Sequence, residues 1–300
     1  MFAVLAAVWG ASYLFIKVAL EDHVPPATIV CVRTLLAALV LLPLALHRDA
    51  IAGLRPFAGP IVLVAVIQVA APFMLITVAE RDLSSSLTGI LVATAPIFTF
   101  MLAFAFEGEE RAGAVSLTGV VIGLAGVALL LGLDTGGSSA AFVAGLLVVL
   151  ASVGYALGAW LLKRTIHGTQ PVGVVAATMS VTAIITLPLI ALDPPDSTPG
   201  LEAVGSLLAL GILGTGLSFL IFYTLMAEEG PAKTSLVAYV APGFSVIYGV
   251  VLLDESFTLS TATGLLLILG GSWLAAEGGL SWHRRRRRLA REAASARAPG

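Results

Sequence analysis

The sequence predicts an all-α membrane protein of ten transmembrane helices, arranged as two inverted repeats of five helices. Its composition, ten long apolar runs and an internal repeat lead to this prediction. Hydrophobic residues make up 58% of the 300 residues and charged residues only 11%, and the mean hydropathy is +1.02. A soluble domain carries about 25% charged residues. A soluble fold of this composition could not cover its surface, so lipid must be part of the solvent.

The apolar residues form ten runs, and a spanning helix needs about 20 mostly apolar residues. Within each run they are continuous and do not alternate, which excludes a transmembrane β-barrel. The first run has no basic segment before it and Lys17 follows it directly, so we expect a spanning helix there and no signal peptide. The predicted spans are residues 1–20, 27–46, 59–79, 84–106, 114–133, 140–162, 171–192, 201–226, 231–253 and 258–280.

The two halves of the chain resemble each other when the sequence is shifted by 146 residues (163 − 17). The chain has only three lysines, and the shift aligns two of them with each other. Trp9 falls on another aromatic residue, Tyr155. It also aligns Lys17 with Lys163, Pro25 with Pro171, Phe73 with Phe219, Thr88 with Thr234, Pro96 with Pro242, Phe98 with Phe244 and Glu109 with Glu255. Faint self-similarity of any Ala-, Leu- and Gly-rich bundle is the alternative explanation.

An odd number of spans in each half makes the repeat an inverted one. After five crossings the second half enters the bilayer from the opposite side, so the halves are related by a pseudo-two-fold axis in the membrane plane. Such repeats place a substrate site near the midplane, where the halves meet. We expect a first repeat over residues 1–133, a second over residues 140–280, and a basic cytoplasmic tail over residues 281–300.

The basic residues predict the orientation. We expect the protein in the inner (plasma) membrane with both termini in the cytoplasm. Most lysines and arginines of the loops then lie on the cytoplasmic side, as the positive-inside rule requires. Lys17 and Arg81 then lie outside. The inside group is Arg48, Arg55, Arg111, Lys163, Arg164, Lys233 and the arginine tail that begins at residue 284. The tail is a topology anchor that attracts anionic lipid headgroups, and nucleic-acid binding is not expected so close to a membrane.

Four segments resemble the EamA domain of the drug/metabolite transporter superfamily. They are "WGASYLFIKVAL", "PPATIVCVRTLLAALVLL", "LSSSLTGILVATAPIFTFMLAFAFEGEE" and "GPAKTSLVAYVAPGFSVIYGVVLLDES". The last two are each followed by a Gly-rich run, and the resemblance extends from Trp9 to about Gly279. It implies two EamA repeats, ten helices, and efflux or uptake of small metabolites such as amino acids.

We therefore expect a transporter that moves a small metabolite, an amino acid or a related amphipathic compound, by alternating access and in the direction of efflux. A membrane-embedded enzyme or a lipid-handling scaffold is the alternative. We expect no enzyme, metal or cofactor, because the four histidines lie in loops or the tail and none has a partner at metal-ligand spacing. The single cysteine, Cys31, excludes a disulfide within the chain.

The candidate substrate cavity combines aromatic, polar and helix-breaking residues near the midplane. Gln68 is the only amide side chain deep inside a span, and a buried amide must face the bundle, where it binds a ligand or bridges two helices. A mid-helix proline kinks its helix and frees a carbonyl, which lines a cavity or is covered by protein. The full set is Trp9, Tyr13, Gln68, Thr94, Pro96, Tyr155, Tyr223, Tyr239 and Pro242. The aromatic members are pocket walls or packing residues.

Arg33 is the only charged residue well inside a predicted span. We expect its side chain to reach the surface or to pair with Glu21, Asp22, Glu80 or Asp82, and the alternative is attraction of an anionic group of the substrate. The second half has Met179 at the equivalent position.

Glycines in the fifth and tenth spans allow helices to approach closely, either within the chain or in a homodimer. They are Gly119, Gly123, Gly126, Gly264, Gly270 and Gly271.

The acidic residues predict transport that is not driven by protons. A proton relay needs a titratable group inside the membrane, and every acidic residue falls at the end of a predicted span or in a loop. Glu80, Glu107 and Glu202 lie nearest to the hydrocarbon. We therefore expect movement down the substrate gradient, as facilitated diffusion or exchange.

Overall fold

The computed structural model describes residues 1–107, 114–230 and 234–276, and every regular element in these ranges is a helix. Nine of these helices are long and apolar enough to cross a membrane, and Val237–Leu252 is a shorter apolar helix. The predicted all-helical fold with ten crossings is confirmed. Glu109, Arg111, Lys233, residues 277–280 of the last predicted span and the tail over residues 281–300 lie outside the described residues.

The first half contains five crossings, of which the third and fourth consist of several helical pieces. The elements are α1 (Phe2–Glu21), α2 (Pro26–His47), the 3₁₀ turn η1 (Ala52–Phe57), α3 (Ala58–Val64), the π-helical η2 (Ala65–Ala70), α4 (Ala71–Ala79), α5 (Ser85–Val92), α6 (Ala95–Glu107) and α7 (Ala114–Leu133).

The second half repeats this order, and the crossing that corresponds to η1–α4 again contains a π-helical piece. The elements are α8 (Ser139–Thr165), α9 (Pro171–Ile190), α10 (Leu201–Leu208), the π-helical η3 (Ala209–Leu217), α11 (Ser218–Glu229), α13 (Val237–Leu252) and the last described helix, Leu259–Ala276.

Local sequence signals start several of these helices. Pro26 and Pro171 occupy the first positions of α2 and α9, where the missing N–H costs no hydrogen bond. The Ser84 hydroxyl accepts from the Leu87 N–H at 3.2 Å and caps α5. The Ser138 hydroxyl does the same for the Ala141 N–H at the start of α8, also at 3.2 Å.

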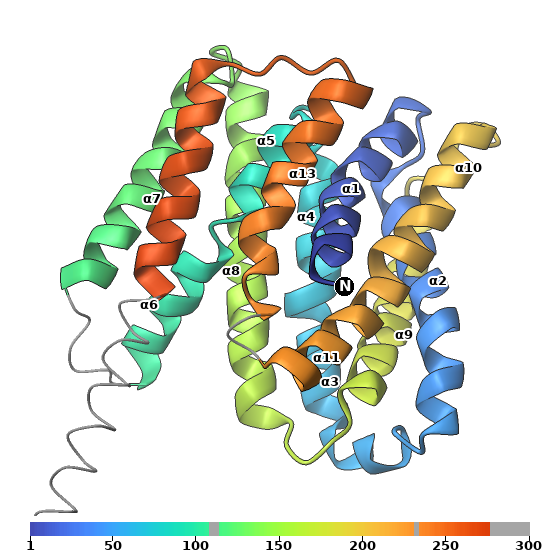
Figure 1. Ribbon diagram of the computed structural model, residues 1–300. Helices are drawn as coiled ribbons and strands as arrows, with labels where there is room; N and C mark the ends of the chain where they lie inside the picture. Colours follow the sequence, from blue (N-terminus) through green and yellow to red (C-terminus); the bar gives the residue numbers. More distant parts are fainter. Residues whose placement is uncertain (108–113, 231–233, 277–300) are drawn as a thin grey trace, which may run out of the picture.

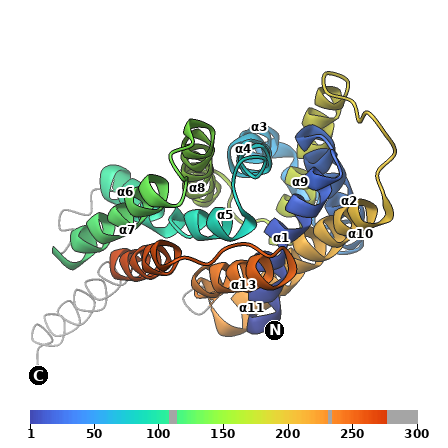
Figure 2. The ribbon, with the colours of Figure 1, turned by 90° about the horizontal axis from the view of Figure 1, so that it is seen from above.

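The helices pack in a pattern that follows the sequence repeat. α1 packs against η3, α10 and α13, and its repeat partner α8 packs against η2, α4, α5 and α6. α2 and α9, which are also repeat partners, pack against each other. Figure 1 and Figure 2 show α6, α7 and the last helix at one edge of the bundle, with α1 among α10, α11 and α13. The first four crossings of each half therefore all contact the other half.

The two mid-span prolines have different consequences. The predicted span over residues 84–106 crosses as Ser85–Phe106, but the expected kink at Pro96 is a break: α5 ends at Val92 and α6 begins at Ala95, with a turn between them. Pro96 starts a new helix. Pro242 instead lies inside the continuous helix α13.

The outer surface carries large apolar side chains. Val121, Leu39 and Leu266 are 66%, 60% and 71% exposed, which suits contact with lipid and would be unfavourable in water.

The glycines of α7 are used for packing within the chain. A side chain at Gly119 or Gly126 would meet the backbone and side chains of the last helix. Gly271 of that helix lies against the backbone of Gly119 and Gly123. Because these glycines bring the two helices together, they fit the packing alternative, whereas a homodimer through these Gly-rich helices stays a prediction.

We predict that Gly271→Leu destabilises the protein by about 1–3 kcal/mol, because the new side chain would overlap the α7 backbone. The matched control is Gly270→Leu, where no other atom lies within 4 Å of an added Cβ. The thermal unfolding midpoint of each purified variant in detergent is the measurement. Equal midpoints for the two variants would contradict this account of the contact.

Candidate functional site

One end of the bundle is held together by polar contacts between the halves. This end, called the Glu80 end, carries the connections at residues 22–25, 80–84, 134–138, 191–200 and 253–258. The Asp22 carboxylate accepts from the Gly200 N–H at 2.7 Å. The Glu255 carboxylate accepts from the Ser85 and Ser86 N–H groups at 2.6 and 3.0 Å and so caps α5. Arg81 and Asp193 form an exposed ion pair at 3.6 Å, which adds little stability.

The carbonyls freed by the break between α5 and α6 are met by hydroxyl groups. The Thr94 hydroxyl donates to the Leu91 carbonyl at 2.7 Å. The Ser152 hydroxyl of α8 lies 3.2 Å from the Val148 carbonyl of its own helix and 3.5 Å from the carbonyl of Val92, the residue four before Pro96. Ser272 of the last helix donates to the Ala93 carbonyl at 2.8 Å. Side chains from the second half thus cover the break, as backbone at membrane depth requires.

The two π-helical pieces occupy equivalent positions in the halves. The 146-residue shift places η2 (Ala65–Ala70) on residues 211–216, which lie within η3 (Ala209–Leu217). Such π-helical turns are rare and occur frequently at functional sites. Gln68 lies in η2 and packs against Gly158 of α8. Thr215 lies in η3 and is completely buried.

Arg33 lies inside the bundle, and the expectation that it reaches the surface is wrong. Its side chain is only 8% exposed. The Nε–H donates to the Thr215 hydroxyl at 2.9 Å, and the guanidinium carbon lies 3.7 Å from the centre of the Phe73 ring. Within the described part of the chain Arg33 forms no ion pair with any carboxylate. Of its five N–H donors, the structure accounts for one.

Two tyrosines surround Arg33. Tyr13 of α1 and Tyr155 of α8 are both close enough to interact electrostatically with its charge. Both also pack against the same apolar cluster, which includes Ile16 and Leu210. Arg33 therefore lies where helices from both halves meet.

Two further aromatic candidates, Trp9 and Tyr223, belong to a group of packed rings. Trp9 packs against Phe219 and Phe222, with ring centroids 6.4 and 5.5 Å apart. Tyr223 packs against the same two rings, at 6.3 and 5.6 Å. Phe73, Phe219, Tyr155 and Tyr223 belong to one cluster. The structure thus brings together Trp9, Tyr13, Arg33, Tyr155 and Tyr223.

Four candidates lie elsewhere. The Tyr239 hydroxyl donates to the Ser272 carbonyl at 3.3 Å and is directed at the last helix. Thr94 and Pro96 belong to the covered break, and Pro242 is buried within α13.

Sequence reasoning missed Phe73 and Thr215, the two direct contacts of Arg33. Phe73 had a usable signal, because it is the repeat partner of Phe219.

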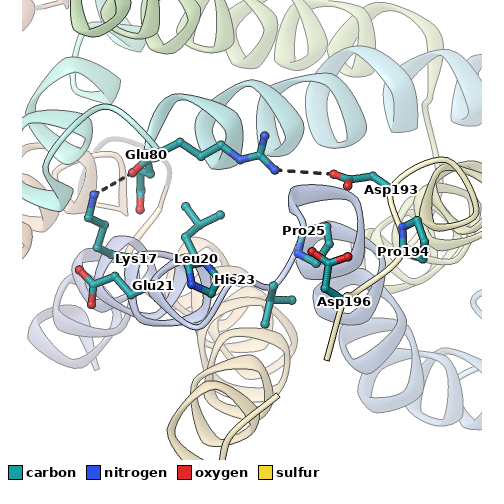
Figure 3. Close-up of a pocket in the computed structure, with 11 residues that line it drawn as sticks. Lys17, Leu20, Glu21, His23, Pro25, Glu80, Asp193, Pro194 and Asp196 are labelled. Carbon is teal, nitrogen blue, oxygen red and sulfur yellow. Dashed lines mark hydrogen bonds and ion pairs between the residues drawn. The ribbon is translucent and has the colours of Figure 1, made fainter. Parts of the chain in front are cut away.

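A pocket of about 390 Å³ opens at the Glu80 end. Lys17 lines it and donates to the Glu80 and Leu83 carbonyls at 2.9 and 3.1 Å, which satisfies the C-terminal end of α4. Figure 3 shows Lys17, Glu80 and Asp193 around this pocket. The volume of the pocket is typical of a small-molecule site, but its lining is charged, whereas such sites are mostly apolar. In the described residues, no group of three or more His, Cys, Asp or Glu side chains could hold a metal ion.

The sequence profile of the EamA-like transporter family matches residues 1–132 and 143–276. An uncharacterized transporter of Bacillus subtilis, YvbV, is 28% identical over 275 residues, which are 90% of this chain and 88% of the relative. The uncharacterized inner membrane transporter YedA of Escherichia coli K12 is 28% identical over 261 residues, which are 85% of this chain and 82% of the relative. A protein known from a crystal structure has a similar fold, with a TM-score of 0.65 at 22% identity over 91% of this chain and 94% of that one.

The chain belongs to the EamA-like transporter family, because the family profile covers most of its length. It is a multi-pass membrane protein, and the predicted resemblance to EamA transporters is confirmed.

Proposed function

We propose that the protein carries a small metabolite with a carboxylate group, of the size of an amino acid, across the cell membrane by alternating access, in the direction of export. The observation that supports this substrate class is Arg33, a buried cation with no carboxylate partner among the described residues. An unpaired charge in a bundle interior is costly. A substrate carboxylate would pair with it and accept the free N–H donors of the guanidinium.

The surrounding rings complete the proposed site. Tyr13 and Tyr155 offer hydroxyl groups near the charge, and Trp9, Phe219 and Tyr223 form an apolar wall for the rest of the substrate. The site lies between crossings from both halves, so movement of one half against the other would expose it to either side in turn. The proposal assigns no catalytic step and no cofactor to the chain.

The test uses pairs of substrates that differ only in the carboxylate. Proteoliposomes are offered radiolabelled amino acids and their amides. We predict that Arg33→Met, which introduces the residue of the equivalent position Met179, lowers flux of the acids by about 10- to 100-fold, since hydrogen bonds to a charged group contribute about 1.5–3 kcal/mol. Arg33→Lys keeps the charge but not the planar donors and retains part of the flux.

The matched control is Arg48→Met, which removes an exposed arginine outside the site. Wild-type flux of the acids in the Arg33→Met protein would refute the role of Arg33. Flux of neither acids nor amides by the wild-type protein, across the panel, would refute the substrate class.

We also propose that both termini lie in the cytoplasm, which places the Glu80 end outside the cell. A fluorescent reporter fused after Gly300 should then be bright, and a cysteine introduced at Gly136 should react with an impermeant reagent added to intact cells. Protection of that cysteine, together with labelling of a cysteine at His167 in the connection at the other end, would invert the assignment.

A further inference from the structure

Glu80 is a buried carboxyl group that the proposed site does not use. It directly follows the span Ala52–Ala79, as expected from the sequence. Its side chain is nevertheless completely buried, and neither carboxylate oxygen has a hydrogen-bond partner in the described part of the chain. An isolated ionised carboxylate in such surroundings is strongly unfavourable, and a carboxyl group in that position takes up a proton instead.

The neighbouring charges do not neutralise Glu80 by contact. The Lys17 ammonium of α1 is bonded to the backbone carbonyls of Glu80 and Leu83. Arg33 of α2 is bonded to Thr215, and the Glu255 carboxylate after α13 is bonded to the start of α5. Tyr13 of α1 also interacts electrostatically with Glu80. The other titratable groups that line the adjoining pocket are Glu21, His23, Arg81, Asp193 and Asp196.

Burial raises the pKa of the Glu80 carboxyl well above its ordinary range. Lys17 acts in the opposite direction, Glu255 adds to the rise, and Arg33 lowers the pKa. The protonated form is therefore favoured in this conformation. Water that entered between the halves would hydrate the carboxylate and return its pKa towards about 4.3.

The position of Glu80 makes protonation of its carboxyl depend on movement of the helices. Glu80 is among the residues that line the pocket at the Glu80 end, whereas its carboxyl is shut off from solvent. The contacts that close this end join the halves through Asp22 and Gly200, and through Glu255 and Ser85. Separation of the halves here would open a path from the pocket to the carboxyl.

We propose that the Glu80 carboxyl is a proton-binding site, and that closure of the Glu80 end of the transporter is accompanied by uptake of one proton from the adjoining aqueous phase. The proton adds to a carboxylate oxygen on closure and returns to water on opening. This inference rests on the proposed alternating-access function. It adds a pH dependence to a chain whose acidic residues, at the ends of predicted spans or in loops, predict transport that is not driven by protons.

The direction of the pH dependence follows from the difference in Glu80 pKa between the closed and the open conformation. The closed form has the higher pKa and binds more protons, so its population is highest below the pKa of the open form. As the pH rises from there towards the raised pKa of the closed form, the ratio of closed to open molecules falls by about tenfold per pH unit.

The test measures the distance across the Glu80 end without substrate. Spin labels are placed at Glu21→Cys and Ser197→Cys, two exposed positions in different halves, in a Cys31→Ala background. Double electron–electron resonance in nanodiscs is recorded from about pH 5 to about pH 9, a range in which buried glutamates titrate. We expect the short-distance population to decrease as the pH rises.

Glu80→Gln carries a neutral amide at every pH and should keep the short distance throughout the titration. The matched control is Asp82→Asn, which removes an exposed carboxylate two residues away and should titrate as the parent protein does. Glu80→Asp keeps an ionisable group and serves if the amide variant does not accumulate. A parent distance distribution that is independent of pH, or Glu80→Gln titrating like the parent, would overturn the proposal. Failure of the substrate proposal would appear as absent flux with the distance titration intact.

Discussion

Many polar groups of this bundle are buried where water cannot reach them, and the protein must therefore satisfy them itself. The break before Pro96 illustrates the constraint, because hydroxyl groups of Thr94, Ser152 and Ser272 lie within hydrogen-bond distance of the carbonyls that border it. The N-terminal end of α5 is met by Glu255, and the C-terminal end of α4 by Lys17. Arg33 and Glu80 are the two charged side chains that are buried among the described residues, and neither is fully satisfied: one N–H of Arg33 has a partner, and the Glu80 carboxyl has none.

Arg33 and Glu80 lie at positions where the two halves of the internal repeat differ. Arg33 corresponds to Met179, its partner Thr215 corresponds to Val69, and Glu80 corresponds to Met226. Val69 and Met179 belong to one apolar cluster, so the first half of the repeat has an apolar contact in place of the Arg33–Thr215 hydrogen bond. The repeat supplies a nearly symmetric scaffold, and the polar chemistry is confined to one copy of each position. A single asymmetric substrate would match this arrangement.

The crossings, the repeat and the family were predictable, because hydropathy and residue matches are local properties of the sequence. The two-piece helix at Pro96 and the π-helical turns around Gln68 and Thr215 were not, since they depend on hydrogen bonds to distant segments. The location of Arg33 was misjudged for a similar reason. A long side chain can extend to the surface or fold inward, and Phe73 and Thr215, from two other crossings, hold it inside. Glu80 was placed correctly along the chain, but its burial depends on how α1 and the segment after α13 cover the end of α4.

The central claim is that this bundle is a carrier whose moving site binds a carboxylate at Arg33. Counterflow tests it most directly. Proteoliposomes are preloaded with an excess of an unlabelled amino acid and diluted into a trace of the same labelled compound, and the internal label is followed over time. The account predicts a transient accumulation of label above the external concentration, which is absent in the Arg33→Met protein and present in Arg48→Met. Monotonic equilibration without an overshoot, for every carboxylate that the protein transports, would contradict it.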